Sequence, residues 1–385
     1  MAQSVGSKLP VFLFVTRVFS ALECRLECAL GYMPNKNGLV TCVEGSFVPY
    51  KTSEFRCEES VALLVSKTGQ AELFSSKKEC KMSLPLSPEL AHSGAKMAVI
   101  DSQVIVMSTD IVLGSKSFMK IHKPSILAMQ YSIEKTIFTS KEAPTILASS
   151  NTILIGGTSK TMKFNKNVWT QVTPMYESGS IFYIPEKTCV IKTSMDTFTI
   201  LGGRIYKDDK EEISEQIIEY NIKNSIATKV ASLNQERYDH SCSIKDQVIR
   251  IAGGKSESED LVDEKYNIQT RTSISMTASA SLNRSEHILV KTGEEIWALG
   301  GISSDGANQP TIMKLNGEFW EPHTEQQLLS HNTSNLMFAS LPMSMVDCTE
   351  GCACGVANAS ATNSNARIYN GNEASVSRAS DLTSF

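Results

Sequence analysis

The sequence predicts an all-β fold built from a repeated unit of about fifty residues. Four Gly-Gly pairs each follow an apolar run, and their first glycines stand at residues 156, 202, 253 and 300, which are 46, 51 and 47 residues apart. The runs are rich in β-branched residues and leucine, which is typical of strands. The body also lacks the 3.6-residue spacing of amphipathic helices. The pairs are Gly156-Gly157, Gly202-Gly203, Gly253-Gly254 and Gly300-Gly301.

Length and composition exclude several classes of protein. The chain has 385 residues, which fits one large domain with additions. With 41% hydrophobic and 20% charged residues it is not a wholly disordered chain. The net charge of −4 argues against a nucleic-acid binder, because no basic excess is present to neutralise phosphates. No apolar run reaches 18 residues, so we expect no transmembrane helix.

Residues 1–21 are a candidate signal peptide. Lys8 supplies a positive charge, Leu9–Val15 supplies a short apolar stretch, and Ser20 or Ala21 supplies a small residue for cleavage. The alternative is a buried N-terminal strand. The choice matters because a secreted protein folds in a compartment where disulfides persist.

Residues 22–58 are expected to form a small cysteine-rich module. Cys24, Cys28, Cys42 and Cys57 crowd a short segment, as in modules that replace a hydrophobic core with cross-links. Zinc binding is the alternative, but no C-x-x-C pair occurs and the gaps of 4, 14 and 15 residues fit no zinc template. Four cysteines allow three pairings, and the spacing alone does not choose among them.

The pattern of this segment resembles a known module. Cys28-x-x-Gly31-Tyr32 is followed by Cys42-x-x-Gly45-x-Phe47 and then by Cys57, which is similar to the second half of a sushi (complement control protein) module. The resemblance implies bridges Cys24–Cys42 and Cys28–Cys57. Cys24 precedes Cys28 by only four residues, whereas the family places its first cysteine far upstream, so we expect a shortened relative or a full module that has lost its front half.

Residues 59–342 contain further repeated features. Arg237-Tyr238-Asp239-His240 and Arg284-Ser285-Glu286-His287 each place their histidine 13 residues before the next Gly-Gly pair. After each pair comes a strand with a large residue. These residues are Phe164, Tyr220, Tyr266 and Leu315, and Trp169 and Trp320 follow the first and the last of them by five residues.

This order of strand, Gly-Gly, strand with a large residue and Trp resembles the kelch repeat. The resemblance implies a kelch-type β-propeller, in which each repeat forms one four-stranded blade. We expect the glycines to admit a neighbouring blade, the aromatic residues to fill the wedge between blades, and the R-x-x-H residues to tie a blade's first strand to its neighbour. We favour this structural role for His240 and His287 over catalysis. No Gly-His and Trp-Asp pairs recur, as WD repeats would require.

Six blades are expected. Gln103–Thr109 and Val61–Ser66 occupy the places of earlier, degraded repeats, and His92 precedes the first of them. Asn335–Leu341 is expected to close the ring by joining the strands of residues 60–84. Five or seven blades are the alternatives. Asp209–Ile218 is the one plausible helix, but we expect it to be an extended loop between strands.

Residues 343–385 are rich in Ser, Asn, Ala and Gly, and we expect a flexible tail. Cys348, Cys352 and Cys354 stand near its start, and one of them, such as Cys348, could cross-link to Cys80 in the closing blade. Metal binding by this cluster is the alternative, but no fourth ligand is evident.

No catalytic motif was found, so no catalytic residue, metal or cofactor is expected. The leading hypothesis is a non-catalytic extracellular recognition or adhesion protein, which binds a protein or glycan partner through propeller loops. Three N-x-S/T sequons agree with secretion, at Asn283, Asn332 and Asn358. One alternative is an intracellular, cytoplasmic kelch adaptor for a ubiquitin ligase or for actin. The other is a copper enzyme resembling galactose oxidase, with a metal between His240 and His287.

Overall fold

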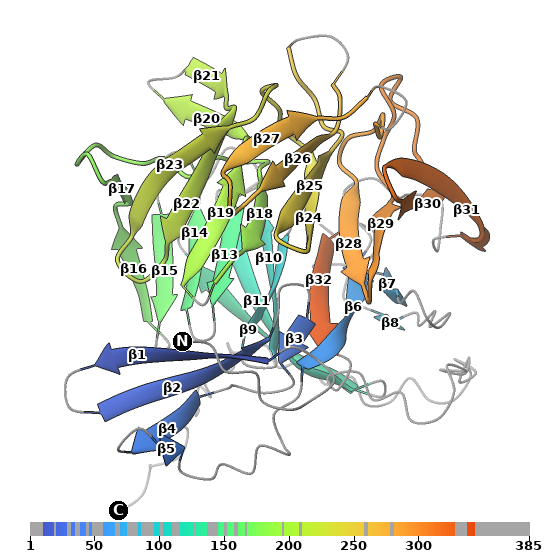
Figure 1. Cartoon of the computed structure of the whole chain (residues 1–385). Coiled ribbons are helices and arrows are strands. Elements are labelled where there is room, and N and C mark those ends of the chain that lie inside the picture. The colour runs from blue at the N-terminus through green and yellow to red at the C-terminus, as the bar shows by residue number, and fades with distance from the viewer. Residues whose placement is uncertain are drawn as a thin grey trace, which may run out of the picture.

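The structure is a computed structural model, and in the residues it describes the chain is all-β and contains no helix (Figure 1). It describes most of residues 145–327, with breaks at 150–151, 158–160, 166–167, 195, 208–209, 258–260 and 278–280, and outside that range it describes the strands given below. The described part accordingly contains no helix that is long and apolar enough to cross a membrane.

Six sheets follow one another along the chain, and we number them 1 to 6. The first three lie in the N-terminal half. Sheet 1 contains β6 (Cys57–Val65), β7 (Gln70–Phe74) and β8 (Leu84–Pro85), and both β3 (Tyr32–Pro34) and β32 (Met337–Pro342) pair with β6. Sheet 2 contains β9 (Lys96–Ile100), β10 (Gln103–Thr109), β11 (Lys116–Ser125) and β12 (Ala128–Thr136). Sheet 3 contains β13 (Thr145–Ser149), β14 (Thr152–Gly156), β15 (Thr161–Asn165) and β16 (Val168–Val172).

The other three sheets repeat the same antiparallel meander. Sheet 4 contains β18 (Cys189–Lys192), β19 (Thr197–Leu201), β22 (Gln216–Asn221) and β23 (Ile226–Ser232), with β17 (Met175–Tyr176) added in parallel to β23. Sheet 5 contains β24 (Ser241–Lys245), β25 (Val248–Ala252), β26 (Glu264–Asn267) and β27 (Thr272–Ser275). Sheet 6 contains β28 (Ile288–Thr292), β29 (Glu295–Leu299), β30 (Thr311–Asn316) and β31 (Phe319–Gln327).

The sheets contact one another in a closed sequence (Figure 1). The first strands β18, β24 and β28 lie side by side in that order, β28 contacts β6, β32 contacts β9, and β9 contacts β13. Sheets 3 and 4 complete the circuit through a shared core that includes Leu147, Leu154, Ile184 and Tyr220. Each sheet therefore lies between two others.

The strand at the end of the repeat region has the partner that the sequence predicts. β32 pairs antiparallel with β6, with Met337 opposite Val65 and Pro342 opposite Ser60. A strand near the C-terminal end of the repeat region, β32, thus adds to sheet 1, whose strand β6 begins at Cys57. This pairing joins the two ends of the repeat region.

The hydrophobic core is divided among the interfaces between sheets. Leu201 and Ile217 of sheet 4 pack with Ile251 and Tyr266 of sheet 5, and each of these side chains is at most 1% exposed. Phe74 of sheet 1 packs edge-on against Trp297 of sheet 6, with 5.5 Å between ring centroids. Because burying one large apolar side chain contributes about 1.5–3 kcal/mol, these interfaces supply much of the stability.

The large residues after the Gly-Gly pairs lie in the third strands, in equivalent registers. Phe164 pairs with Ile153, Tyr220 with Phe198 and Tyr266 with Ile249. Tyr220 and Tyr266 pack against the preceding sheet, as expected for residues that fill a wedge. Trp320 of β31 likewise packs with Ala252 and Leu282 beside sheet 5. Trp169 lies in β16, and its side chain is outside the described residues.

Near the N-terminus the structure has another antiparallel sheet, with β1 (Val11–Val18), β2 (Ala21–Cys28), β4 (Leu39–Val43) and β5 (Ser46–Phe47). The candidate signal peptide thus contains a strand, whose burial lies outside what the structure describes; removal of residues 1–21 stays a prediction. The predicted boundary between residues 58 and 59 falls inside β6, whose first residues pair with β3.

Several predicted features lie outside the described residues. They are the side chains of Cys24, Cys28, Cys42 and Cys57, together with Cys80, His92, Asn332, Cys348, Asn358 and the tail of residues 343–385.

The segment Asp209–Ile218, predicted as an extended loop, contains strands. β20 (Arg204–Lys207) and β21 (Lys210–Ile213) form a two-stranded hairpin that leaves sheet 4 directly after its Gly-Gly pair, and β22 begins at Gln216 (Figure 1). Glu211 and Glu212 are exposed on the hairpin.

Candidate functional site

The residues just before the first strands of sheets 4, 5 and 6 have the same backbone path. We call residues 185–188, 237–240 and 284–287 the corner segments. In each, the third residue is left-handed: Lys187 has φ 51°, Asp239 53° and Glu286 55°. The first corner segment was missed in the sequence because Pro-Glu-Lys-Thr lacks the R-x-x-H pattern. Its spacing was a usable signal, since Thr188 stands 14 residues before Gly202.

Main-chain hydrogen bonds join the corner segments of successive sheets into a ladder. Glu286 N donates to Asp239 O at 2.9 Å, and Asp239 N donates to Lys187 O at 3.0 Å. The second glycine of a Gly-Gly pair adds a further bond to the ladder. Gly203 N donates to Arg237 O at 2.8 Å, and Gly254 N donates to Arg284 O at 2.9 Å. We call the end of sheets 4 to 6 that carries the Gly-Gly pairs, the corner segments and the hairpin the glycine end.

The first glycine of a pair lies where the next sheet approaches most closely. Gly202 and Gly253 both have φ +58°, and a Cβ on either would collide with the carbonyl oxygen of Arg237 or Arg284, respectively. A left-handed backbone and a close neighbour thus both require glycine. At these two positions the glycine main chain lies against the carbonyl group of a neighbouring sheet.

Replacing Gly253 by alanine is expected to lower the free energy of unfolding by about 3 kcal/mol or more. The reasons are the left-handed backbone and the collision with Arg284 O. Gly306→Ala is the matched control, because Gly306 has φ +82° and open space around it, so only the backbone cost of about 1–2 kcal/mol applies. Urea unfolding of both variants measures the difference. Equal losses would contradict the close approach of sheet 6 to Gly253.

The two arginines of the R-x-x-H pattern hold their own sheet rather than the neighbouring one. Arg237 is 0% exposed and donates to Gly253 O at 3.3 Å, to Val262 O at 2.8 Å and to Glu264 at 2.6 Å. Arg284 donates to Gly300 O at 3.1 Å and Thr311 O at 3.0 Å. The predicted tie to the neighbour therefore runs through the arginine carbonyl oxygens and not through the side chains.

Burial lowers the pKa of both arginine side chains. It lowers the pKa of Arg237, and the charges of Glu264 and Asp263 oppose that shift. Burial lowers the pKa of Arg284 to about 10. Both guanidinium groups remain protonated at neutral pH.

His240 and His287 are buried against the glycines of the preceding sheet. Their Cε1 atoms lie close to the positions where a Cβ of Gly202 and Gly253 would stand, at 3.2 and 2.9 Å. Burial lowers the pKa of His287 to about 3, assisted by Arg284, and lowers that of His240 well below its ordinary value, assisted by Arg237 and His287. Neither nitrogen of His287 has a hydrogen-bond partner among the described residues. The two rings thus pack as neutral groups at the sheet interfaces.

These histidines are expected to make stability fall in acid. Their pKa values are lower in the folded chain than the usual 6.5, so the unfolded chain binds protons first as the pH falls. Stability is then lost below about pH 6.5, by up to about 1.4 kcal/mol per pH unit for each histidine. Urea unfolding between pH 7 and 5 should show a smaller slope in His287→Gln than in the wild type. His323→Gln, at a half-buried position, is the control; an unchanged slope in His287→Gln would contradict the assignment.

Two adjacent carboxylates, which the sequence analysis did not single out, form the polar centre of sheet 5. Glu264 is 0% exposed and accepts from Arg237, from the main-chain N–H groups of Asn234 and Gln235, and from Ser273. Asp263, also 0% exposed, accepts from Gly253 N, Arg250, Leu282 N and Trp320. Leu282 and Trp320 lie in the next repeat, so Asp263 joins sheets 5 and 6.

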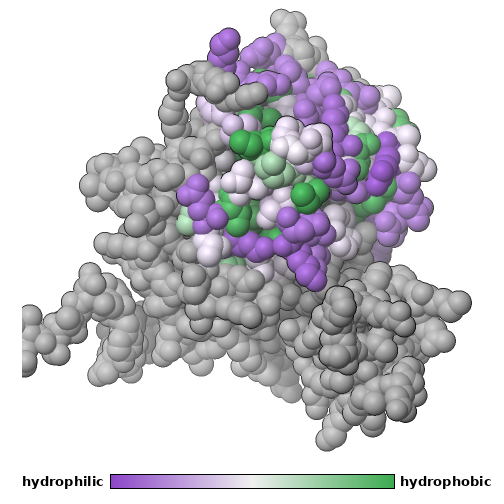
Figure 2. Space-filling view, turned by 90° about the vertical axis from the view of Figure 1, so that its left-hand side faces the viewer, coloured by the Kyte–Doolittle hydropathy of each residue, from purple (hydrophilic) through white to green (hydrophobic). Residues whose placement is uncertain are grey.

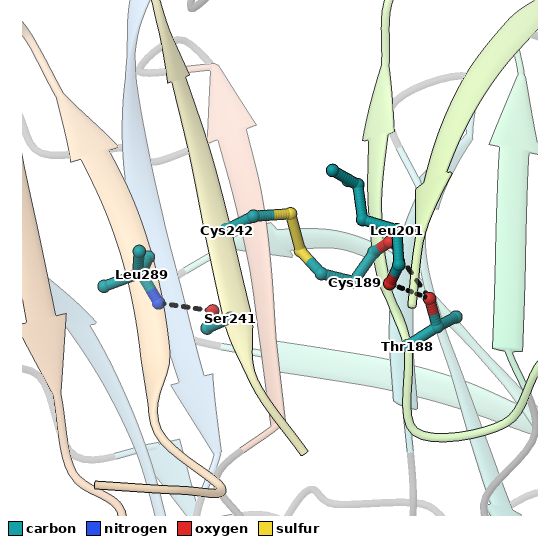
Figure 3. Close-up of a disulfide and its surroundings, with 6 residues drawn as sticks. All are labelled: Thr188, Cys189, Leu201, Ser241, Cys242 and Leu289. Carbon is teal, nitrogen blue, oxygen red and sulfur yellow. Dashed lines mark hydrogen bonds between the residues drawn. A yellow bond between two sulfur atoms is a disulfide. The ribbon is translucent and has the colours of Figure 1, made fainter. Parts of the chain in front are cut away.

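A disulfide that was not among the predicted pairs joins sheets 4 and 5 (Figure 3). Cys189 of β18 and Cys242 of β24 are bridged, with 5.9 Å between their Cα atoms. Beside it, Thr188 donates to Leu201 O at 2.6 Å, and Leu289 N donates to Ser241 Oγ at 2.8 Å, which joins β28 to β24. The bridge and the hydrogen bond from Leu289 to Ser241 both join first strands of neighbouring sheets, whereas the Thr188 bond lies within sheet 4.

Partly exposed charges lie above the ladder. Lys255 pairs with Glu286 at 2.8 Å and with Asp239 at 3.5 Å, and Arg204 stacks on the Tyr238 ring at 3.7 Å. Burial alone would lower the pKa of Lys255, but the hydrogen bond to Glu286 and the charge of Asp239 raise it. Among the residues that Figure 2 colours, on the side nearest β17 and β23, hydrophilic, intermediate and apolar ones are interspersed. In the described part, no group of three or more His, Cys, Asp or Glu side chains could hold a metal ion.

Comparison with protein-family models and with curated proteins returned no match for this chain.

Proposed function

We propose that sheets 1 to 6 are the blades of a six-bladed, kelch-type β-propeller. Three features support this: the closed sequence of contacts between four-stranded sheets, the pairing of β32 with β6, and the repeated corner segments beside Gly-Gly pairs. Closing a ring with a strand from the far end of the chain protects the edges of the first blade.

We further propose that the protein is a non-catalytic recognition or adhesion protein that acts outside the cytosol. The disulfide Cys189–Cys242 supports this compartment, because disulfides persist in oxidising surroundings and are rare in cytosolic proteins. The bridge joins two propeller blades and belongs to the repeat region itself. The location therefore does not depend on the resemblance of residues 22–58 to a sushi module.

The binding surface that we propose is the glycine end of sheets 4 to 6. The observation that carries this proposal is the ladder Lys187–Asp239–Glu286, which fixes the main chain while their side chains, with Tyr238 and Lys255, remain partly exposed. Rigid loops that display charged and aromatic groups are typical of surfaces that bind proteins or glycans. The hairpin β20–β21 stands beside these residues and extends the surface.

The test uses the full chain secreted from cultured cells and two probes, an array of defined glycans and a panel of cell-surface ectodomains. Tyr238→Ala combined with Lys255→Ala changes the glycine end. Lys245→Ala combined with Glu294→Ala changes an exposed ion pair at the opposite end of the sheets and is the control. We expect at least a tenfold loss of binding in the first variant alone. Loss of binding in the control variant alone would place the binding site at the opposite end of the sheets. A chain that stays in the cytosol with free Cys189 and Cys242 would overturn the proposed location.

A further inference from the structure

The loop that joins β27 to β28 displays one residue between two buried anchors. Asn283 is exposed, whereas Leu282 and Arg284 on either side are 3% and 7% exposed. Leu282 N donates to Asp263 at 3.1 Å, and Arg284 is held by Gly300 O and Thr311 O. The position of Asn283 is therefore fixed, and its side chain makes no hydrogen bond with any described residue.

Asn283 begins the sequon Asn283-Arg284-Ser285. An asparagine that receives an N-linked glycan must lie at the surface of the folded protein, where the oligosaccharide has room in solvent. Asn283 meets this condition. The other two sequons, at Asn332 and Asn358, lie outside the described residues.

The serine of this sequon is covered in the folded chain. Ser285 is 4% exposed, and its main chain exchanges two hydrogen bonds with Ile302, at 2.8 and 2.9 Å. A transferase that must recognise the serine hydroxyl can reach it only before this corner segment folds. The modification thus belongs to the emerging chain, and the folded, unmodified protein is a poor acceptor.

We propose that Asn283 carries an N-linked glycan; the inference rests on the proposed function, because it requires entry into the secretory route. The donor is an oligosaccharide bound through a diphosphate to a lipid. The amide nitrogen of Asn283 forms a bond to the anomeric carbon of the first sugar, the bond from that carbon to the diphosphate breaks, the lipid diphosphate leaves, and the amide loses one proton.

The position of the glycan divides the surface of the glycine end into a part that the sugar covers and a part that stays open. Asn283 precedes the corner segment of sheet 6, whose Arg284 O accepts from Gly254 N of sheet 5, so the sugar stands at the junction of these two sheets. A hydrated oligosaccharide there covers nearby protein surface. The surface around Tyr238, Arg204 and the hairpin β20–β21 then remains as the part open to a partner.

The experiment is peptide mapping of the full chain secreted from mammalian cells, before and after treatment with an amidase that releases N-linked glycans. We expect the peptide with Asn283 to carry the glycan, and Asn283→Gln to lose the mass of one glycan with little change in melting temperature. Asn332→Gln and Asn358→Gln are matched controls that keep this glycan. A second sample is folded, sugar-free protein prepared from bacteria. Adding the lipid-linked donor and the transferase to this sample should leave Asn283 unmodified.

Two negative results have different meanings. If Asn283 is bare in secreted protein whose Cys189 and Cys242 are bridged, the glycan proposal is overturned and the proposed location stands. If the chain remains in the cytosol with both thiols free, the proposed location fails and the glycan proposal fails with it.

Discussion

Replacing Glu264 by glutamine is expected to lower the free energy of unfolding by about 3–5 kcal/mol. The carboxylate of Glu264 and the guanidinium of Arg237 are both 0% exposed and lie 2.6 Å apart. Glutamine leaves the buried arginine charge without the carboxylate that is hydrogen-bonded to it, so that only the charge of Asp263 remains nearby. Its amide group also turns hydrogens toward N–H donors, including those of Asn234 and Gln235. Both effects destabilise only the folded state.

The matched control is Glu318→Gln, which removes a half-exposed carboxylate that pairs with Lys265 and, at 4.0 Å, with Arg250. Glu318 is 49% exposed, so its loss should cost about 1 kcal/mol or less. Chemical denaturation of both variants at neutral pH measures the two losses. A loss below 1 kcal/mol in Glu264→Gln would show that Arg237 finds another partner or reaches water.

Removing the disulfide by the double substitution Cys189→Ala and Cys242→Ala is expected to cost about 4 kcal/mol. The cysteines are 53 residues apart, and a bridge over that length restricts the unfolded chain by roughly this amount in the loop-entropy model. The bridge also joins β18 to β24, so its loss removes a covalent tie between sheets 4 and 5. Unfolding in urea, followed by tryptophan fluorescence, measures the change.

The control for this prediction is the wild-type protein in the presence of a thiol reductant. It keeps both cysteine side chains but lacks the bond, and comparison with the double variant in the same reductant separates the cross-link from the lost packing of Cys242 and from the reduction of any other bridge. The reduced wild type and the double variant should lose similar amounts. An unchanged wild type in reductant, with both thiols shown to be free, would contradict the expected role of the bridge.

The repeat pattern predicted much of the fold because glycines report local backbone geometry. The spacing of the Gly-Gly pairs located second strands in four sheets, and the apolar run 335–341 located β32. Both are local signals. The backbone at Gly202 and Gly253 is left-handed, a conformation that glycine adopts without steric cost, so the residue type signals such a turn.

The pairing of β32 with β6 was predicted, but side-chain contacts between distant residues were not. Cys189 and Cys242 become neighbours only because β18 and β24 are the first strands of adjacent sheets. Asp263 and Glu264 read as ordinary loop carboxylates until the fold buries them beside Arg250 and Arg237. The corner segment 185–188 was missed for a related reason, since main-chain hydrogen bonds define it and its side chains differ from those of its counterparts.

That ladder has a consequence for how this surface can change over evolutionary time. Its bonds from Glu286 N to Asp239 O and from Asp239 N to Lys187 O use only main-chain atoms. The three side chains already differ in sign and length while their φ angles agree within a few degrees. Mutations at these positions can therefore alter the charge presented to a partner and leave the hydrogen bonds beneath them intact. Selection for a new partner and selection for folding act here on separate atoms.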